Sequence, residues 1–334
     1  MTDAAVLTAG SWGTVFAKVL ADAGCSVALV TRDPDLATAI NRDRRNPRYL
    51  PGMVLPGRVT ATNDAALALR ASELVVLAIP AQALRASLTR WAPHARPGAI
   101  YVSLMKGIEA GTRLRMSEVI RQVTGVGPEQ VAVVSGPNLA AEIAAEQPAA
   151  TVVASAEPAT AQRLQDACWT PYLRPYSNTD VVGCELAGAV KNVIALAVGM
   201  VEGMGFGANT VASLITRGLA ETARLGTAMG AQELTFAGLA GLGDLAATCS
   251  SPLSRNRGFG EKLGRGMTLA AVRAEQKQVA EGVRSCGPIL ELARARGVAM
   301  PITEQVERVL YEGRPPMDAV KELMSRAPGP EYHS

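Results

Sequence analysis

The sequence predicts an α/β domain, in which helices cover a parallel sheet, followed by an all-helical domain. Short β-prone runs alternate with helical patterns up to about residue 180, and helical patterns alone continue from there. Apolar strands separated by helices are typical of a parallel sheet covered on both faces. The 334 residues, 48% of them hydrophobic, suffice for two domains. We expect the first to span residues 1–182 and the second residues 183–334.

The expected elements follow from the local patterns. In the first domain, β-prone runs indicate strands at 4–7, 27–31, 74–79, 100–103, 131–135 and 151–154. Amphipathic patterns between them indicate helices such as 81–90 and 114–124. In the second domain, a 3.6-residue periodicity indicates helices at 186–200, 210–229, 269–275, 283–296 and 302–312.

Composition excludes several classes of protein. A formal net charge of +3 is too small to indicate a nucleic-acid partner. The five cysteines are scattered without a Cys-x-x-Cys spacing, which disfavours a disulfide framework or a zinc site and suits a reducing cytoplasm. We find no signal-peptide pattern, and the longest apolar run, 193–201, is too short to span a membrane. We therefore expect a soluble cytoplasmic protein.

Histidine is nearly absent. The chain has two, His94 and His333, so the sequence disfavours catalysis by a histidine general base or a Ser-His-Asp triad. Lysine, aspartate, glutamate, tyrosine and cysteine remain as titratable groups for catalysis.

The stretch VLTAGSWGTVFAKVL, residues 6–20, nearly matches the Gly-x-Gly-x-x-Gly fingerprint of dinucleotide-binding sites. Gly10 and Gly13 fill the second and third positions, where glycine permits close approach of the pyrophosphate and of strand and helix. Thr8 occupies the first position, the tight turn. With the alternating α/β pattern that follows, this stretch predicts a Rossmann-type nucleotide site.

Thr8 is the departure from this pattern. If the turn requires φ above zero, a β-branched residue there is strained by roughly 1–3 kcal/mol. The alternative is a turn shifted to negative φ, with the threonine hydroxyl bonded to a nearby backbone amide. We expect the strained or crowded arrangement.

The second predicted strand bears on the choice of cofactor. It ends in Thr31 and Arg32, with Asp33 one position later. Arg32 can bind a 2′-phosphate, which favours NADP without excluding NAD; the alternative is a surface arginine. The basic run NRDRRNPRYLPG, residues 41–52, is interpreted as a solvated loop rather than a polyanion-binding patch.

Two features of the helical half indicate chemistry. Lys191 lies in a helical segment that is apolar on nearly all faces; burial would lower its pKa toward neutrality, unless the side chain extends to water. The segment GLAGLGDLAATCSSPLSRNRGFG, residues 238–260, combines glycines around Asp244 with a Ser-Arg-Asn cluster suited to a phosphate. The alternative is an interhelical loop with exposed arginines.

Together these motifs resemble a known family. AGSWGT, RNPRYLPG, SLMKGIE, SGPNLAAEIA, VVGCELAGAVKNVIALAVGM, GLAGLGDLAATCSSPLSRNRGFG and VAEGVRS occur in the order and approximate spacing of bacterial-type NAD(P)-dependent glycerol-3-phosphate dehydrogenases. The resemblance runs nearly end to end. The Lys-Asn helix and the GLGDL…SRN segment carry most of its specificity.

The resemblance implies roles for individual residues. Lys191 would exchange the proton at the C2 oxygen of the substrate, with Lys106 and Asp244 near it. The implied substrate-binding residues are Lys106, Gly136, Asn138, Lys191, Asp244, Ser254, Arg255 and Asn256. The implied cofactor-binding residues are Gly10, Ser11, Trp12, Gly13, Arg32, Tyr49, Lys106, Ala140, Arg255, Val279 and Glu281. Asn138 stands where the family often has serine or threonine, and all three can donate a hydrogen bond.

The implied reaction is the reversible reduction of dihydroxyacetone phosphate to sn-glycerol 3-phosphate by NADPH or NADH, which supplies phospholipid synthesis. The implied partners are these two phosphates and, as a candidate, a second copy of the chain in a homodimer. One alternative is a related dehydrogenase acting on a 3-hydroxy acid or 6-phosphogluconate, whose pattern fits the GLGDL…SRN segment poorly. The other is a nucleotide-sensing protein that has lost turnover.

Overall fold

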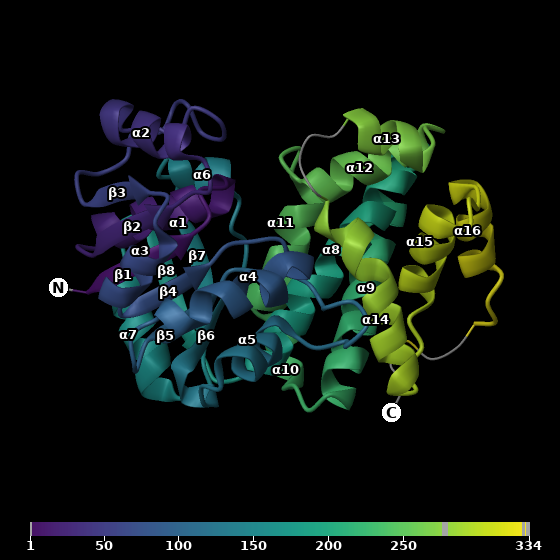
Figure 1. Cartoon of the computed structure of the whole chain (residues 1–334). Coiled ribbons are helices and arrows are strands. Elements are labelled where there is room, and N and C mark those ends of the chain that lie inside the picture. The colour runs from purple at the N-terminus through teal and green to yellow at the C-terminus, as the bar shows by residue number, and fades with distance from the viewer. Residues whose placement is uncertain (1, 276–279, 329–330, 332–334) are drawn as a thin grey trace.

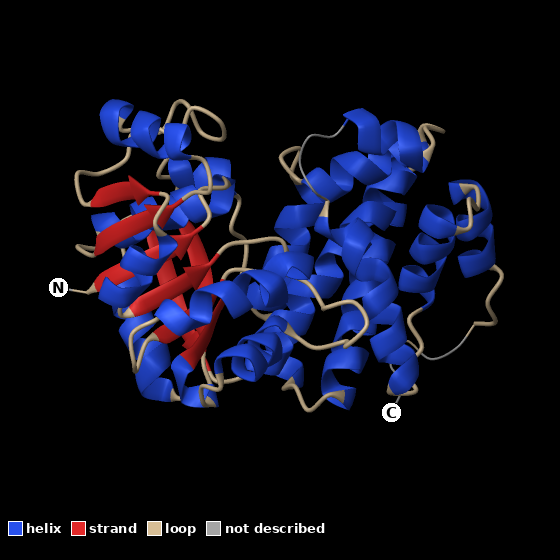
Figure 2. Ribbon diagram, viewed as in Figure 1, coloured by secondary structure: helices blue, strands red, loops and turns tan. Residues whose placement is uncertain are grey.

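The computed structural model describes residues 2–275, 280–328 and 331. The strands gather in the N-terminal half of the chain, and the C-terminal half is built from helices packed beside it (Figure 1). Figure 2 shows the same division by element type, with every drawn strand on one side of the molecule. The α/β-plus-helical fold class predicted from the sequence is confirmed. The domain boundary between residues 182 and 183 stays a prediction.

The described residues form one eight-stranded sheet with the order β3-β2-β1-β4-β5-β6-β7-β8. Strands β1 to β6 pair in parallel, β7 runs antiparallel to β6, and β8 is parallel to β7. The sheet is therefore parallel as predicted, except at the pairing of β6 with β7. The strands span Asp3–Leu7, Ser26–Val30, Val59–Thr62, Leu74–Leu77, Ile100–Ser103, Val131–Ser135, Ala149–Ala154 and Leu173–Asn178.

Helices connect the strands and bury the sheet. Glycine or a capping carboxylate begins several of them: Gly10 precedes α1, and Asp33 and Asp64 cap α2 and α3 through their side chains. The α-helices of this half are α1 Ser11–Asp22, α2 Pro34–Asp43, α3 Ala65–Ala71, α4 Leu84–Trp91, α5 Met116–Thr124, α6 Ala140–Ala144 and α7 Pro158–Cys168. Short 3₁₀ turns lie at Ala81–Ala83, Ala92–His94 and Pro128–Gln130.

The second half contains helices and no strands among its described residues. Its α-helices are α8 Val181–Gly203, α9 Ala208–Ala228, α10 Glu233–Ala237, α11 Asp244–Ser250, α12 Arg255–Gly264, α13 Leu269–Glu275, α14 Glu281–Ala295, α15 Pro301–Tyr311 and α16 Pro316–Met324. A π-helical turn, η4 Leu239–Gly243, leads into α11.

Helix α8 is the central element of this half. Its side chains from Gly183 to Val201 are buried, and α9, α11, α12, α14 and α15 pack around it. It is the one helix of the described residues that is long and apolar enough to cross a membrane. However, 89% of its apolar 18-residue stretch is buried inside the protein. Its environment is that of a core helix. A polar residue between Gly183 and Val201 is therefore surrounded by protein rather than water.

Two strands escaped the sequence analysis. β3 reads VTAT and β8 reads LRPYSN, so neither contains a continuous apolar run. Both lie at an edge of the sheet, where one side of the strand needs no neighbour and Pro175 is tolerated. Short helices α10, α11, α12 and α16 were also missed, because each is too short or too glycine-rich for a clear 3.6-residue pattern.

Candidate active site

The turn between β1 and α1 has the construction that the fingerprint predicts. A Cβ at Gly10 would meet no atom of the described residues within 4 Å, so this side of the turn is open. A Cβ at Gly13 would lie 2.3 Å from the Thr8 carbonyl oxygen and 3.1 Å from the Ala78 Cβ. Gly13 therefore lets α1 pack on the strand ends, while Gly10 leaves room for a ligand at the N-terminus of the helix, where backbone amides attract a phosphate.

Thr8 adopts φ = 94°, in the region that β-branched residues rarely occupy. The prediction of a strained turn is confirmed, and the alternative of a turn shifted to negative φ is wrong. The hydroxyl group does not bond a backbone amide; it donates to the Ala78 carbonyl oxygen at 2.8 Å. This bond ties the end of β1 to the segment after β4 and helps to hold the unusual backbone conformation.

The carboxyl ends of β5 and β6 bring two site segments against α8. Lys106 follows β5, and its Nζ donates to the carbonyl oxygen of Gly136, which follows β6, at 3.0 Å. Gly136 has φ = 128°, a conformation that favours glycine. On α8, a Cβ at Gly188 would lie 3.0 Å from Ser135 Oγ and 3.3 Å from Lys106 Cγ. The absence of a side chain at Gly188 thus lets the core helix α8 approach the carboxyl ends of β5 and β6.

Asp244 joins the two halves of the site. One carboxylate oxygen accepts from Lys106 Nζ and the other from Lys191 Nζ, each at 2.5 Å. The Asp244 side chain is 1% exposed, and the Lys106 and Lys191 side chains are 16% and 10% exposed. A single buried carboxylate therefore holds two ammonium groups from distant segments. The structure brings together the three residues that the sequence analysis expected side by side.

Lys191 is buried rather than extended toward water, so the alternative of a side chain reaching solvent is wrong. Burial lowers the pKa of Lys191 to about 8, and the nearby Lys106 ammonium adds to this effect, while Asp244 opposes it. A group with this pKa can exchange a proton near neutral pH.

Thr248 is a site residue that the sequence analysis missed. Its hydroxyl accepts a hydrogen bond from Lys191 Nζ at 2.6 Å and lies 3.5 Å from Asp244 Oδ1. Thr248 and Asp244 stand four residues apart on α11, so they share one face of that helix. That spacing in GDLAAT was the available signal.

The predicted phosphate segment begins α12. Ser254 caps this helix by accepting from the Arg257 amide at 3.3 Å, and Arg255 and Asn256 occupy its first turn. Asn256 is buried: its Nδ2 donates to Asn192 Oδ1 at 2.9 Å, and its Oδ1 accepts from the Gly282 amide at 3.0 Å. Asn192 directly follows Lys191, so this contact places the first turn of α12 beside the lysine cluster.

Several buried polar atoms near these segments lack a hydrogen-bond partner among the described residues: Trp12 Nε1, Asn138 Oδ1 and Glu281 Oε2. Buried polar groups are normally paired, so such atoms fit contacts with a bound ligand. Burial raises the pKa of the Glu281 carboxyl, and the charge of Arg255 opposes this shift. Arg255 and Glu281, both predicted at the cofactor, thus interact electrostatically. Val279, also predicted there, lies outside the described residues.

The remaining predicted residues follow the carboxyl ends of strands or begin the helices after them. Ser11 is the first residue of α1, and Ala140 is the first of α6. Arg32 is exposed after β2, and Tyr49 is 37% exposed in the loop that follows α2. The described residues thus offer an open glycine turn, unpaired polar atoms and exposed basic groups, which are features that suit a dinucleotide.

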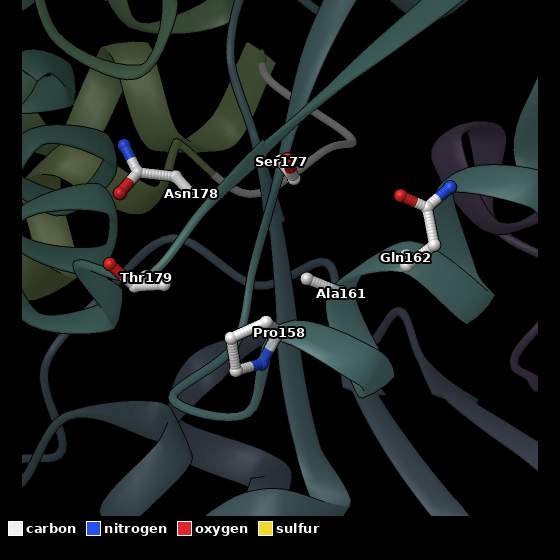
Figure 3. A pocket seen from close by; sticks show the side chains of 6 residues that line it. All are labelled: Pro158, Ala161, Gln162, Ser177, Asn178 and Thr179. Atoms are coloured by element: carbon white, nitrogen blue, oxygen red, sulfur yellow. The ribbon is translucent and has the colours of Figure 1, made fainter.

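A separate surface hollow of about 390 Å³ lies between α7 and the end of β8, as Figure 3 shows. Its lining consists of Pro158, Ala161, Gln162, Ser177, Asn178 and Thr179. These residues include none of the predicted site residues, so the hollow is not the candidate site.

Comparison with known proteins places the whole chain. Residues 3–161 match the family model described as NAD-dependent glycerol-3-phosphate dehydrogenase N-terminus, and residues 180–321 match the model of its C-terminus. The chain is 72% identical over 332 residues to glycerol-3-phosphate dehydrogenase [NAD(P)+] of Frankia casuarinae, covering 99% of both chains. It is 62% identical to the protein of the same name from Streptomyces avermitilis, covering 98% of both.

A solved structure agrees with these matches. The 2.1 Å crystal structure of glycerol-3-phosphate dehydrogenase from Coxiella burnetii superposes with a TM-score of 0.92 at 37% identity. The likeness covers 97% of this chain and 99% of that one, so it includes both the sheet and the helical half.

Proposed function

Because the chain belongs to the NAD-dependent glycerol-3-phosphate dehydrogenase family, we propose that the Lys191–Asp244–Lys106 cluster carries out that family's reaction. The chain is an NAD(P)-dependent oxidoreductase that interconverts dihydroxyacetone phosphate and sn-glycerol 3-phosphate. One observation supports the assignment of residues: two ammonium groups share one buried carboxylate where α8 meets the carboxyl ends of β5 and β6. The family match also disfavours a dehydrogenase of 3-hydroxy acids or 6-phosphogluconate.

Lys191 is the proposed proton donor and acceptor. The nicotinamide ring, when bound, supplies or accepts the hydride. During reduction, negative charge develops on the C2 oxygen of the substrate; the Lys191 ammonium stabilises that charge and delivers its proton there. During oxidation, the neutral Lys191 amine accepts the proton from the C2 hydroxyl group. A pKa of about 8 lets the same side chain serve both directions near neutral pH.

Asp244 and Thr248 orient Lys191 for this exchange. An ammonium group has three N–H donors. Among the described residues, Lys191 gives one to Asp244 and one to Thr248, which leaves the third for the substrate oxygen. Lys106 likewise uses two donors, on Asp244 and the Gly136 carbonyl, and we assign its third to substrate or cofactor. Asp244 therefore positions both cations without itself taking the proton.

The substrate phosphate is assigned to the first turn of α12. A helix N-terminus attracts anions, and Ser254, Arg255 and Asn256 supply further donors there. The buried contact between Asn256 and Asn192 sets the spacing between this anchor and Lys191. Anchoring the phosphate away from the reacting carbon orients the carbonyl group, which lowers the entropic cost of reaction.

For the cofactor, we propose that the pyrophosphate lies over Gly10 and the N-terminus of α1, near Ser11 and Trp12. Arg32 and Tyr49 would contact the adenosine end, and Ala140, Arg255 and Glu281 the nicotinamide half. We further propose that NADPH is preferred, because an arginine rather than an available carboxylate stands at the end of β2.

The direct test measures NADPH oxidation with dihydroxyacetone phosphate, acetoacetyl and keto-acid substrates. We expect turnover with dihydroxyacetone phosphate far above the others. Arg255→Ala should raise the KM for this substrate at least ten-fold, because a charge-assisted contact to a dianion is lost. Lys262→Ala, which removes a cation from the exposed side of α12, is the matched control. Tight NADPH binding without turnover would instead support the nucleotide-sensing alternative.

Location and assembly are finer proposals. We propose a cytoplasmic enzyme, since all five cysteines are free thiols and buried, and a role in supplying glycerol phosphate to phospholipid synthesis. A homodimer stays a prediction, which light scattering of the purified protein would check.

A further inference from the structure

Asp33 is the acidic residue at the end of β2, where a site that prefers NAD presents a carboxylate to the ribose hydroxyl groups. Here the protein itself occupies both carboxylate oxygens. Oδ1 accepts hydrogen bonds from the backbone amides of Asp35 at 3.0 Å and Leu36 at 3.3 Å, which caps α2. Oδ2 accepts a hydrogen bond from Arg48 Nη2 at 2.7 Å. This bond lowers the pKa of the Asp33 carboxyl and so favours its charged, paired form.

Arg48 also decides the local charge. Arg32 and Asp35 are exposed beside Asp33, and one arginine against two aspartates gives this strand end a net charge of −1. Arg48 brings the sum to zero, and the N-terminus of α2 adds a partial positive charge. Without Arg48, a phosphate group would approach an excess of negative charge. With Arg48, these charges balance, and the phosphate approaches the Arg32 guanidinium, the Arg48–Asp33 ion pair and a helix N-terminus.

A buried asparagine fixes the position of Arg48. Asn46 is fully buried, and its Nδ2 donates to the Ala9 carbonyl oxygen and to Thr14 Oγ1, both at 2.9 Å. Its Oδ1 accepts from the Arg48 backbone amide at 3.2 Å. One side chain therefore connects the glycine turn between β1 and α1 to the backbone of Arg48. The loop that carries Arg48 is held in register with the proposed pyrophosphate site.

We propose that Arg48 is a specificity-determining residue that favours a dinucleotide with a 2′-phosphate over one with a free 2′-hydroxyl group. It withholds the Asp33 carboxylate from the ribose and places a cation where the 2′-phosphate binds. The inference rests on the proposed function, because it takes the end of β2 as the adenosine end of the cofactor site. It gives a role to the basic run 41–52, which the sequence analysis interpreted as a solvated loop.

The test compares two probes that differ in the 2′ group, 2′,5′-ADP and 5′-ADP, by titration calorimetry. For Arg48→Ala we expect the Kd of 2′,5′-ADP to rise about ten-fold, because a charge-assisted contact is lost. The Kd of 5′-ADP should stay the same or fall, because the Asp33 carboxylate becomes available to its ribose hydroxyl groups. Arg45→Ala is the matched control: Arg45 lies in the same loop, is exposed, and donates to the carbonyl oxygens of Pro51 and Gly52. It should leave both values unchanged.

A second variant isolates the contribution of Asp33. Adding Asp33→Asn to Arg48→Ala removes the uncovered negative charge while keeping an oxygen that can cap α2. We expect this double variant to recover at least three-fold of the lost 2′,5′-ADP affinity. Arg48→Lys should lose less affinity than Arg48→Ala, because the ion pair uses one guanidinium nitrogen and an ammonium keeps the charge.

The outcomes separate this inference from the proposed function. If Arg48→Ala weakens both probes equally, or neither, Arg48 does not select the 2′ group and the inference is overturned, whatever the activity. If the wild-type protein turns over dihydroxyacetone phosphate in a separate NADPH-oxidation assay, the proposed function stands independently. If the wild-type protein binds neither NADPH nor 2′,5′-ADP, both ideas fail.

Discussion

Lys18 and Lys191 are both buried lysines on helices, yet their environments shift their pKa values in opposite directions. Burial alone would lower the pKa of Lys18, but hydrogen bonds overcome it and raise the pKa above the usual value. The acceptors are Asp22 Oδ2 at 2.6 Å, Glu146 Oε1 at 2.8 Å and the Tyr172 hydroxyl at 3.3 Å. The Lys191 pKa falls to about 8.

The two lysines differ in how far nearby carboxylates offset the effect of burial. Around Lys18, two carboxylates face one ammonium group, whereas around Asp244 one carboxylate faces two. Burial has the largest influence on the Lys191 pKa and lowers it, and the single carboxylate shared with Lys106 does not outweigh it. At Lys18 the hydrogen bonds to two carboxylates and Tyr172 outweigh burial, so this lysine stays charged and ties α1 to the segment after α6.

The largest expected effect separates the two lysines by activity. Lys191→Met should lower kcat by roughly 10²- to 10⁴-fold, because it removes the proposed acid–base group. Its NADPH affinity, measured by fluorescence titration, should stay nearly unchanged. Lys18→Met should change kcat less than three-fold. Similar losses of kcat in both variants would show that Lys191 is only another structural lysine.

The second prediction concerns pH. Reduction needs the Lys191 ammonium, so its single-turnover rate should fall as pH rises through about 8; oxidation needs the neutral amine, so its rate should rise over the same range. Lys106→Met removes a neighbouring cation that lowers the Lys191 pKa. The midpoint of the profile should then move upward by about one pH unit. The readout is the midpoint, because the rate itself also falls. A downward movement would contradict the conclusion that the Lys106 ammonium lowers the Lys191 pKa.

The third effect is on stability. Lys18→Met should lower the free energy of unfolding by about 2 kcal/mol, a value below that of a fully buried ion pair because Glu146 is 59% exposed. The folded-state pKa is raised, so the stabilisation is present in full below the unfolded-state value of about 10.4. Urea unfolding at pH 6 to 9 should therefore show the same decrease in the free energy of unfolding of Lys18→Met at every pH. Lys191→Met should lose less, since Asp244 keeps Lys106 as its partner.

The smallest effect is expected at the other end of α1 from Lys18. Thr8→Gly relieves the strain of φ = 94°, but it loses the hydroxyl bond to Ala78 and adds freedom to the unfolded chain. We expect NADPH binding to tighten a few-fold and the KM for dihydroxyacetone phosphate to stay unchanged. Unchanged or weaker binding in fluorescence titration would mean that the turn has adapted to its threonine.

Much of the site was predictable because its motifs are local. The glycine turn, the apolar segment around Lys191 and the glycines around Asp244 could each be recognised within about twenty residues. Asn46, Arg48 and Thr248 were not predicted as site residues. Asn46 acts through contacts with residues 37 and 32 positions away, and Arg48 pairs with an aspartate fifteen positions before it. No short pattern in the sequence announces such pairs.

The sequence by itself determined the division into an α/β half and a helical half, the nucleotide turn and the supply of titratable groups, because these depend on neighbouring residues. Only the tertiary structure decided the state of each charge. Lys191 meets a carboxylate 53 positions away, and that carboxylate meets Lys106, 138 positions before it. A pKa depends on loss of water and on nearby charges, and both are set by packing between distant segments. For this reason we expect Lys191 to exchange a proton and Lys18, also buried in the same chain, to stabilise the fold.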